Sequence, residues 1–65
     1  MKNREALQVA VAILSADIDE LIMAMNTMVR QGEIDKAFDG MQTVCTMTQA
    51  RSKLRLMLAK VEREQ

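Results

Sequence analysis

An apolar repeat between Leu7 and Met28 constrains the fold more than any other feature of the sequence. Its positions alternate in steps of four and three residues over three heptads: Leu7, Val11, Leu14, Ile18, Leu21, Met25 and Met28. This spacing places the side chains along one face of an α-helix that packs against other helices. Because an apolar stripe in contact with water is unfavourable, the repeat predicts a helix with at least one helical partner.

The composition favours helices along the whole chain. There is no proline, there are two glycines, and Phe38 is the single aromatic residue. Ala, Leu, Met, Glu, Gln, Arg and Lys dominate, and all of them are good helix formers. A β-sheet protein would need more β-branched and aromatic residues and more turn signals. We therefore predict an all-α fold.

A second helix is predicted after Gln31-Gly32. Glycine tolerates the left-handed conformation just past a helix end, and the three acidic residues between positions 33 and 39 suit the start of a helix. A connection this short makes the two helices antiparallel neighbours. The elements expected in this single domain, residues 1–65, are a helix over about 4–30, a turn at 31–33 and a helix over about 34–62.

Two places could interrupt the helices and produce three or four shorter ones. Asp17-Ile18-Asp19-Glu20 has the spacing of a capping box, so a helix could end before Ser15–Asp17 and restart there. The unbroken heptad register favours one continuous helix at this point. Gly40 costs about 1 kcal/mol relative to alanine inside a helix. It either breaks the second helix or lets another helix approach closely.

The apolar residues of the second helix fall into two groups. The early group is Ile34, Ala37, Phe38, Met41, Val44 and Cys45, and the late group is Leu54, Leu58 and Val61, with Leu56 and Met57 beside it. A mostly polar span over residues 46–53 separates them. Because the two groups do not share one heptad register, a stutter or a local bend is expected between them.

The first helix has more apolar surface than one partner helix can cover. Its outer positions include Val9, Ala12, Ile13 and Ala16, which is typical of a helix buried on several sides. A chain this short gains only about 3–5 kcal/mol from its own core. We therefore predict that the hairpin forms a homodimer, a four-helix bundle. The expected interface residues are Leu7, Val11, Leu14, Ile18, Leu21, Leu54, Leu58 and Val61.

Neither a catalytic, a cofactor nor a metal site is predicted, and the chain is expected not to be an enzyme. The sequence has no histidine, the commonest general base and metal ligand. The single cysteine, Cys45, falls within an apolar group and is interpreted as a buried small hydrophobe. The acidic residues Asp17, Asp19 and Glu20 are interpreted as a solvated face or a helix cap. The methionines near the turn are interpreted as core filling, with an adaptable docking surface as the alternative.

A basic cluster near the C-terminus is the main candidate for a functional contact. Its members are Arg51, Lys53, Arg55, Lys60 and Arg63. Arg51 and Arg55, four residues apart, share a helix face, and guanidinium groups suit phosphates. However, the chain has zero net charge and almost no aromatic side chains on which bases could stack. A nucleic-acid-binding regulator is therefore the alternative, and a regulator that binds an unidentified protein is the favoured prediction.

The chain is expected to be cytoplasmic, without membrane contact. Its longest strictly apolar run, Val9 to Leu14, is far shorter than the roughly 20 residues that span a bilayer. Lys2 and Arg4 precede this run as they would in a signal peptide, but no small-residue cleavage site follows.

The layout resembles that of the Rop family, plasmid RNA-binding proteins that are dimers of helical hairpins. The resemblance covers the whole length and rests on the order helix, Gln31-Gly32 turn, helix, so it implies a four-helix bundle. The RNA-reading residues of that family have no counterparts here, and its activity is not implied. The size, the helical style and the start Lys2-Asn3-Arg4-Glu5-Ala6-Leu7 are also similar to small accessory proteins of lambdoid phages.

Overall fold

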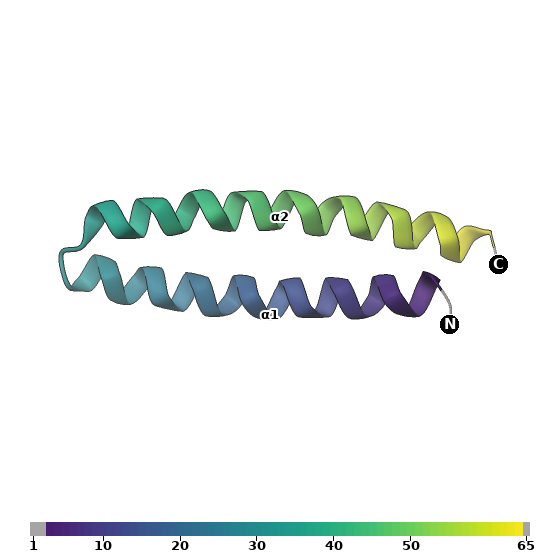
Figure 1. The fold of residues 1–65 in the computed structure, drawn as a ribbon, viewed down its shortest axis with the longest axis horizontal. Helices are drawn as coiled ribbons and strands as arrows, with labels where there is room; N and C mark the ends of the chain where they lie inside the picture. Colours follow the sequence, from purple (N-terminus) through teal and green to yellow (C-terminus); the bar gives the residue numbers. More distant parts are fainter. Residues whose placement is uncertain (1–2, 65) are drawn as a thin grey trace.

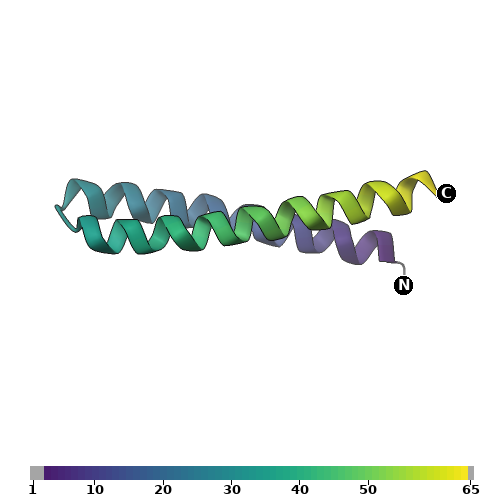
Figure 2. The ribbon, with the colours of Figure 1, turned by 90° about the horizontal axis from the view of Figure 1, so that it is seen from above.

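The chain forms a hairpin of two long helices (Figure 1). The computed structural model describes residues 3–64, in which α1 runs over Asn3–Arg30 and α2 over Ile34–Arg63. The helices lie antiparallel and side by side, and Figure 2 shows that they cross at a shallow angle. No strand occurs among the described residues. The predictions of an all-α fold and an antiparallel helical hairpin are therefore confirmed.

The turn between the helices is a Schellman motif built around Gly32. The φ angle of Gly32 is +80°, in the left-handed region that favours glycine. Its N–H donates to the carbonyl of Val29 at 3.0 Å, and the N–H of Glu33 donates to the carbonyl of Met28 at 2.8 Å. These two bonds satisfy carbonyls that the helix end would otherwise leave unpaired. The predicted role of Gly32 at the end of the first helix is confirmed.

Both helices are continuous, which excludes the alternative of three or four shorter ones. α1 passes through Ser15–Asp17 and α2 passes through Gly40 without leaving the helical conformation. A Cβ atom placed on Gly40 would lie 2.9 Å from Cγ of Met25. Gly40 therefore does not break α2; it lets the Met25 side chain pack directly against the α2 backbone.

Three contacts fix the register of α1 against α2. From the turn to the free ends, they are Met25 on Gly40, Arg51 with Ser15, and Arg4 with Glu62. Successive contacts are ten or eleven residues apart on both helices. The register therefore stays constant along the hairpin, as a heptad seam requires.

The facing residues of both helices form one uninterrupted heptad stripe, which we call the seam. On α1 it consists of the seven apolar positions predicted from the sequence. On α2 it consists of Ala37, Gly40, Val44, Met47, Arg51, Leu54, Leu58 and Val61, in steps of three and four residues. The predicted stutter is therefore wrong. Of the early apolar group, Ala37 and Val44 lie on the seam, whereas Ile34, Phe38, Met41 and Cys45 lie beside it and are exposed.

The hairpin is long and thin. Its principal extents are 50 × 15 × 13 Å, and its radius of gyration is 14.9 Å, compared with about 11 Å for a compact domain of this length. Ile18 and Ala37 are the buried residues among those described, with 3% and 5% of their surface exposed. The other seam residues are only half-buried. Two helices side by side do not enclose a core.

Candidate interaction surfaces

All eight residues of the predicted oligomer interface lie on the seam, where they join α1 to α2 of the same chain. They are Leu7, Val11, Leu14, Ile18, Leu21, Leu54, Leu58 and Val61. Ile18 is buried, and the other seven keep part of their surface in solvent. In a four-helix bundle, the same a and d positions also face the second hairpin. Their intermolecular role stays a prediction.

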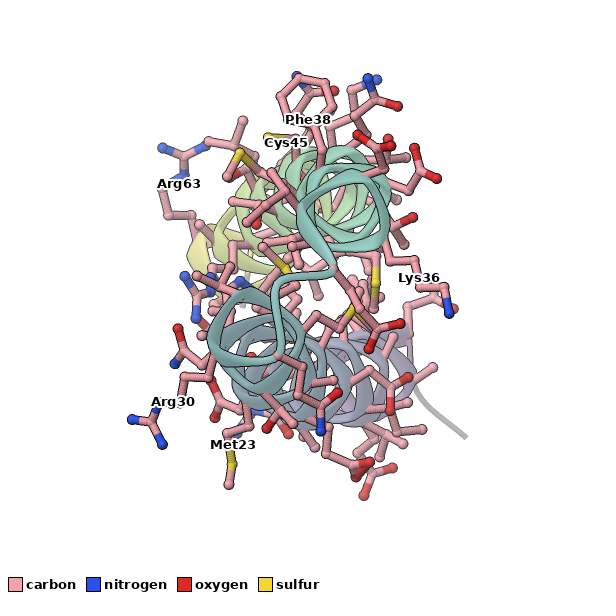
Figure 3. The ribbon with its side chains drawn as sticks, turned by 90° about the vertical axis from the view of Figure 1, so that its left-hand side faces the viewer. Met23, Arg30, Lys36, Phe38, Cys45 and Arg63 are labelled. Carbon is pink, nitrogen blue, oxygen red and sulfur yellow. The ribbon has the colours of Figure 1, made fainter. Side chains whose placement is uncertain are left out.

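Two flanks border the seam. If the seam residues are the a and d positions of the heptad, the e and b positions form one flank and the g and c positions form the other. Because the helices are antiparallel, the e flanks of α1 and α2 lie on the same side of the hairpin. Figure 3 looks along the hairpin from the turn and shows Phe38 and Cys45, both b positions, projecting from α2 away from α1. Lys36, a g position, projects on the other flank.

An apolar groove runs along the e flank in the half of the hairpin next to the turn. Its walls are Val29 and Asn26 of α1 and Ile34, Phe38 and Met41 of α2, over Met25 and Ala37 at its floor. Ile22, one heptad before Val29, extends the apolar surface along α1 and is also exposed. We call Ile22, Val29, Ile34, Phe38 and Met41 the turn patch.

A second apolar region lies on the g flank in the half of the hairpin that holds the chain ends. One groove there runs between Ala6 and Leu7 of α1 and Met57 and Val61 of α2, and its rim includes Lys60 and Glu64. An adjoining groove follows α1 along Ala6, Val9, Ala10 and Ile13. We call Ala6, Val9, Ala10, Ile13 and Met57 the terminal patch. The two patches thus lie at opposite ends and on opposite flanks of the hairpin.

The basic cluster is spread around the circumference of α2. Lys53 and Lys60 lie on the g flank, Arg55 lies on the e flank, and Arg63 is on the outer side, all of them exposed. Arg51 lies on the seam and is half-buried. Arg51 and Arg55 are neighbours on the helix, as predicted, but the five cations do not form one continuous face.

Arg51 makes a contact that the sequence did not indicate. Its Nη1 donates a hydrogen bond of 3.1 Å to Oγ of Ser15, and the pair is partly buried. Ser15 is an e position, so the guanidinium group leaves the seam toward the e flank. This contact joins the middle of α1 to the middle of α2 and is the polar interruption of an otherwise apolar seam.

Cys45 is exposed, so its interpretation as a buried hydrophobe is wrong. It is a b position on the e flank, one heptad after Phe38, and it does not reach the seam. The prediction that the methionines near the turn fill the core holds for only some of them. Met25 and Met28 fill the seam, whereas Met23 and Met41 are exposed.

The described residues gather no set of three His, Cys, Asp or Glu side chains that could hold a metal ion. Asp17, Asp19 and Glu20 are all exposed on α1. Neither helix, as far as residues 3–64 define it, is long and apolar enough to cross a membrane.

Sequence reasoning missed the turn patch because it assigned that stripe to the seam. Ile34, Phe38, Met41 and Cys45 follow each other in steps of four, three and four, which is a valid heptad stripe. The seam from Ala37 to Val61 is longer and runs without a slip, but it includes Gly40 and Arg51, so hydrophobicity alone does not select it. The exposed apolar residues of the terminal half of α1, by contrast, were predicted from their outer positions.

Comparison with protein-family models, curated proteins and solved structures finds no match to this chain.

Proposed function

We propose that this protein is a non-enzymatic interaction protein, a helical hairpin that pairs with a second copy and regulates another protein by binding it. The observation that carries the proposal is the amount of apolar surface that one hairpin leaves in water. Ten large apolar side chains of the described residues are 42% or more exposed. Monomeric proteins rarely keep contiguous apolar patches of this kind unless the patches bind something.

The exposed area supports self-association. The chain exposes 5020 Å², whereas a compact monomer with its mass of 7.3 kDa exposes about 4,200 Å². The excess is about 800 Å², which matches the roughly 800 Å² that each partner buries in a typical specific interface. A second hairpin would also cover the half-buried seam and complete the four-helix bundle that the layout resembles.

The presence of two separate apolar patches supports binding to another protein as well. If one patch contacts the second copy, the other stays available at the far end of the hairpin. The terminal patch is an open apolar groove with Lys60 and Glu64 at its rim, and such a groove fits the apolar face of an amphipathic helix. The regulator that we propose is a small cytoplasmic protein, such as a phage or plasmid accessory factor.

Sedimentation equilibrium over a wide concentration range tests the self-association. We expect a species of about 14.6 kDa, twice the 7.3 kDa of the chain. A folded species of 7.3 kDa at high concentration would contradict the proposal.

A pull-down from host lysate, with and without nuclease, tests the partner class. The proposal predicts a protein partner that survives nuclease and is lost when Ile13, on the terminal patch, is replaced by aspartate. Capture that disappears with nuclease would instead support the nucleic-acid alternative through the exposed members of the basic cluster, and its affinity would then fall steeply with salt.

A further inference from the structure

We propose that the second copy docks on the turn patch, with the turns of both hairpins at the same end of the bundle. In this arrangement, α1 of each copy lies against α2 of the other, and the two-fold axis runs along the bundle. The inference rests on the proposed self-association and adds to it the surface and the orientation of the dimer.

The distribution of apolar side chains favours the e flank as the surface on which the second copy docks. The turn patch is contiguous from α1 to α2, because its residues line both walls of one groove. Half-buried seam residues, Met25 and Ala37, form the floor, so a helix in this groove would extend the core rather than create a separate one. Phe38, 58% exposed, is the single aromatic residue, and aromatic side chains are the commonest anchors of protein interfaces.

The same distribution selects the orientation. With the turns at the same end, the turn patch of one copy meets the turn patch of the other. If the turns lay at opposite ends and the hairpins overlapped fully, the patch would instead meet the e flank of the terminal half, whose polar residues are Glu5, Gln8, Arg55 and Glu62. Apolar side chains would then be buried against polar ones, which costs free energy wherever polar groups lose their water.

The charges on the e flank favour the same orientation. On α1, this flank carries Glu5 and Asp19; on α2 it carries Arg55 and the guanidinium group of Arg51, which points toward Ser15. Its remaining charged group, Glu62, is already close to Arg4. With the turns together, α1 faces α2 of the second copy in the register that Ser15 and Arg51 define, so Asp19 of one copy lies within about one helical turn of the level of Arg51 in the other. With the turns apart, α1 faces α1 and like charges meet near the centre, which disfavours that complex.

The g flank is less suited to the symmetric contact. It carries more charged side chains than the e flank, with Asp17 at its middle: Asp17, Glu20, Lys36, Asp39, Lys53, Lys60 and Glu64. A two-fold contact centred on this flank would remove more charged groups from water than a contact on the e flank, and with the turns apart it would also bring the Asp17 carboxylates of both copies together. The terminal patch on the g flank therefore stays free for the other protein.

The surface is tested with a matched pair of variants on α2, Phe38→Asp and Leu56→Asp. Both residues are large, apolar and exposed, at 58% and 71%, and neither lies on the seam, but only Phe38 belongs to the turn patch. We expect Phe38→Asp to weaken dimerisation by about 30-fold or more, as for a central interface residue, and Leu56→Asp to change it less than threefold. Equal effects of the two variants, or no effect of Phe38→Asp, would overturn the assignment of the surface.

The orientation is tested by distances between spin labels in the dimer. Two single-cysteine proteins are made in a Cys45→Ser background, one with Gln31→Cys at the turn and one with Arg63→Cys at the end of α2. Both sites are exposed and lie off the seam. Turns at the same end predict that both label-to-label distances are shorter than about 35 Å, the width of a four-helix bundle plus the labels.

Opposite orientations give a different pair of distances. Hairpins that overlap fully with their turns apart would place the Gln31 labels nearly the length of the molecule apart, since its long extent is 50 Å. Hairpins that overlap only at their turn halves would separate the Arg63 labels by even more. Either result would overturn the orientation while leaving the dimer intact, whereas a monomer in sedimentation would overturn the proposed function itself.

Discussion

The two halves of the hairpin differ in the side chains that pack between α1 and α2. Next to the turn, α2 presents small residues, Ala37 and Gly40, and α1 fills the space with Met25 against the α2 backbone. Near the chain ends, leucines and valines of the two helices face each other. Where the two halves of the hairpin meet, the contact between the helices is polar, from Arg51 to Ser15. The turn half is thus packed with the Met25 side chain against the α2 backbone at Gly40, and the terminal half with larger side chains on both helices.

This difference between the halves decides where the exposed apolar side chains lie. Because the small α2 residues occupy the seam in the turn half, the large ones, Ile34, Phe38 and Met41, lie on the e flank. In the terminal half, the seam itself takes the leucines, and the surplus comes from α1 on the other flank. One heptad pattern therefore produces two patches that face different directions, which is what a dimer with a further partner requires.

The largest effect is expected at the centre of the seam, where both halves meet. Ile18→Asp places a carboxylate at the least exposed of the positions that the structure describes, 3% exposed, and should lower the free energy of unfolding by about 4 kcal/mol. For a chain of this size that removes the helical signal in circular dichroism. Ile13→Asp is the matched control, since Ile13 is 56% exposed on the same helix. If the two variants were equally stable, the assignment of the seam would be wrong.

The close approach in the turn half is tested by a double-mutant cycle on Met25 and Gly40. Alanine at position 40 gains about 1 kcal/mol of helix propensity, but its Cβ would lie 2.9 Å from Cγ of Met25. Gly40→Ala should therefore stabilise the Met25→Ala protein by about 1 kcal/mol and stabilise the unmodified protein by clearly less. Urea unfolding measures both steps. Equal effects in the two backgrounds would show that Gly40 is not needed for packing.

The polar interruption in the middle of the seam is tested by Arg51→Leu. Leucine restores the apolar stripe, so we expect stability to rise by about 1 kcal/mol, or a Tm higher by roughly 4–8 °C at fixed protein concentration. The same substitution at Lys53, which is exposed on α2, is the control and should leave Tm within about 2 °C. A lower Tm for Arg51→Leu would mean that the bond to Ser15 outweighs the lost apolar contact.

The smallest effect is expected at the free ends. Nε of Arg4 lies 4.0 Å from Oε2 of Glu62, and both side chains are about half exposed, so solvent screens the pair. Glu62→Gln should change the free energy of unfolding by less than about 0.5 kcal/mol, and no more than the same change at Glu64. A loss above 1 kcal/mol in thermal unfolding would show that this pair, rather than apolar packing, closes the terminal half.

How much the sequence predicts differs between the two helices for a physical reason. On α1, every seam position carries a large apolar residue, so the register could be read directly. On α2, the seam includes Gly40 and Arg51, which no hydrophobicity pattern selects, while Phe38 and Cys45 belong to a more apolar competing stripe. The choice between the stripes depends on which α2 side chains leave room for Met25, and only the paired structure contains that information.

Of the two apolar patches, one could be predicted from the sequence and the other could not. The exposed apolar positions Val9 and Ile13 of α1 followed from the helical wheel, because the opposite face was already assigned. The turn patch did not, because Ile34, Phe38 and Met41 were assigned to the packing face of the second helix, and Ile22 and Val29 were not singled out. The inward position of Arg51 also could not be foreseen, since arginine side chains are mostly solvated.

The central claim is that one hairpin leaves too much apolar surface to be stable alone. The most direct test is the Tm of the unmodified protein over at least a hundredfold range of concentration, because a dimer that unfolds to separate chains gains stability from mass action. We predict that Tm rises continuously with concentration. A Tm that is constant over the whole range, with a cooperative transition, would contradict the claim.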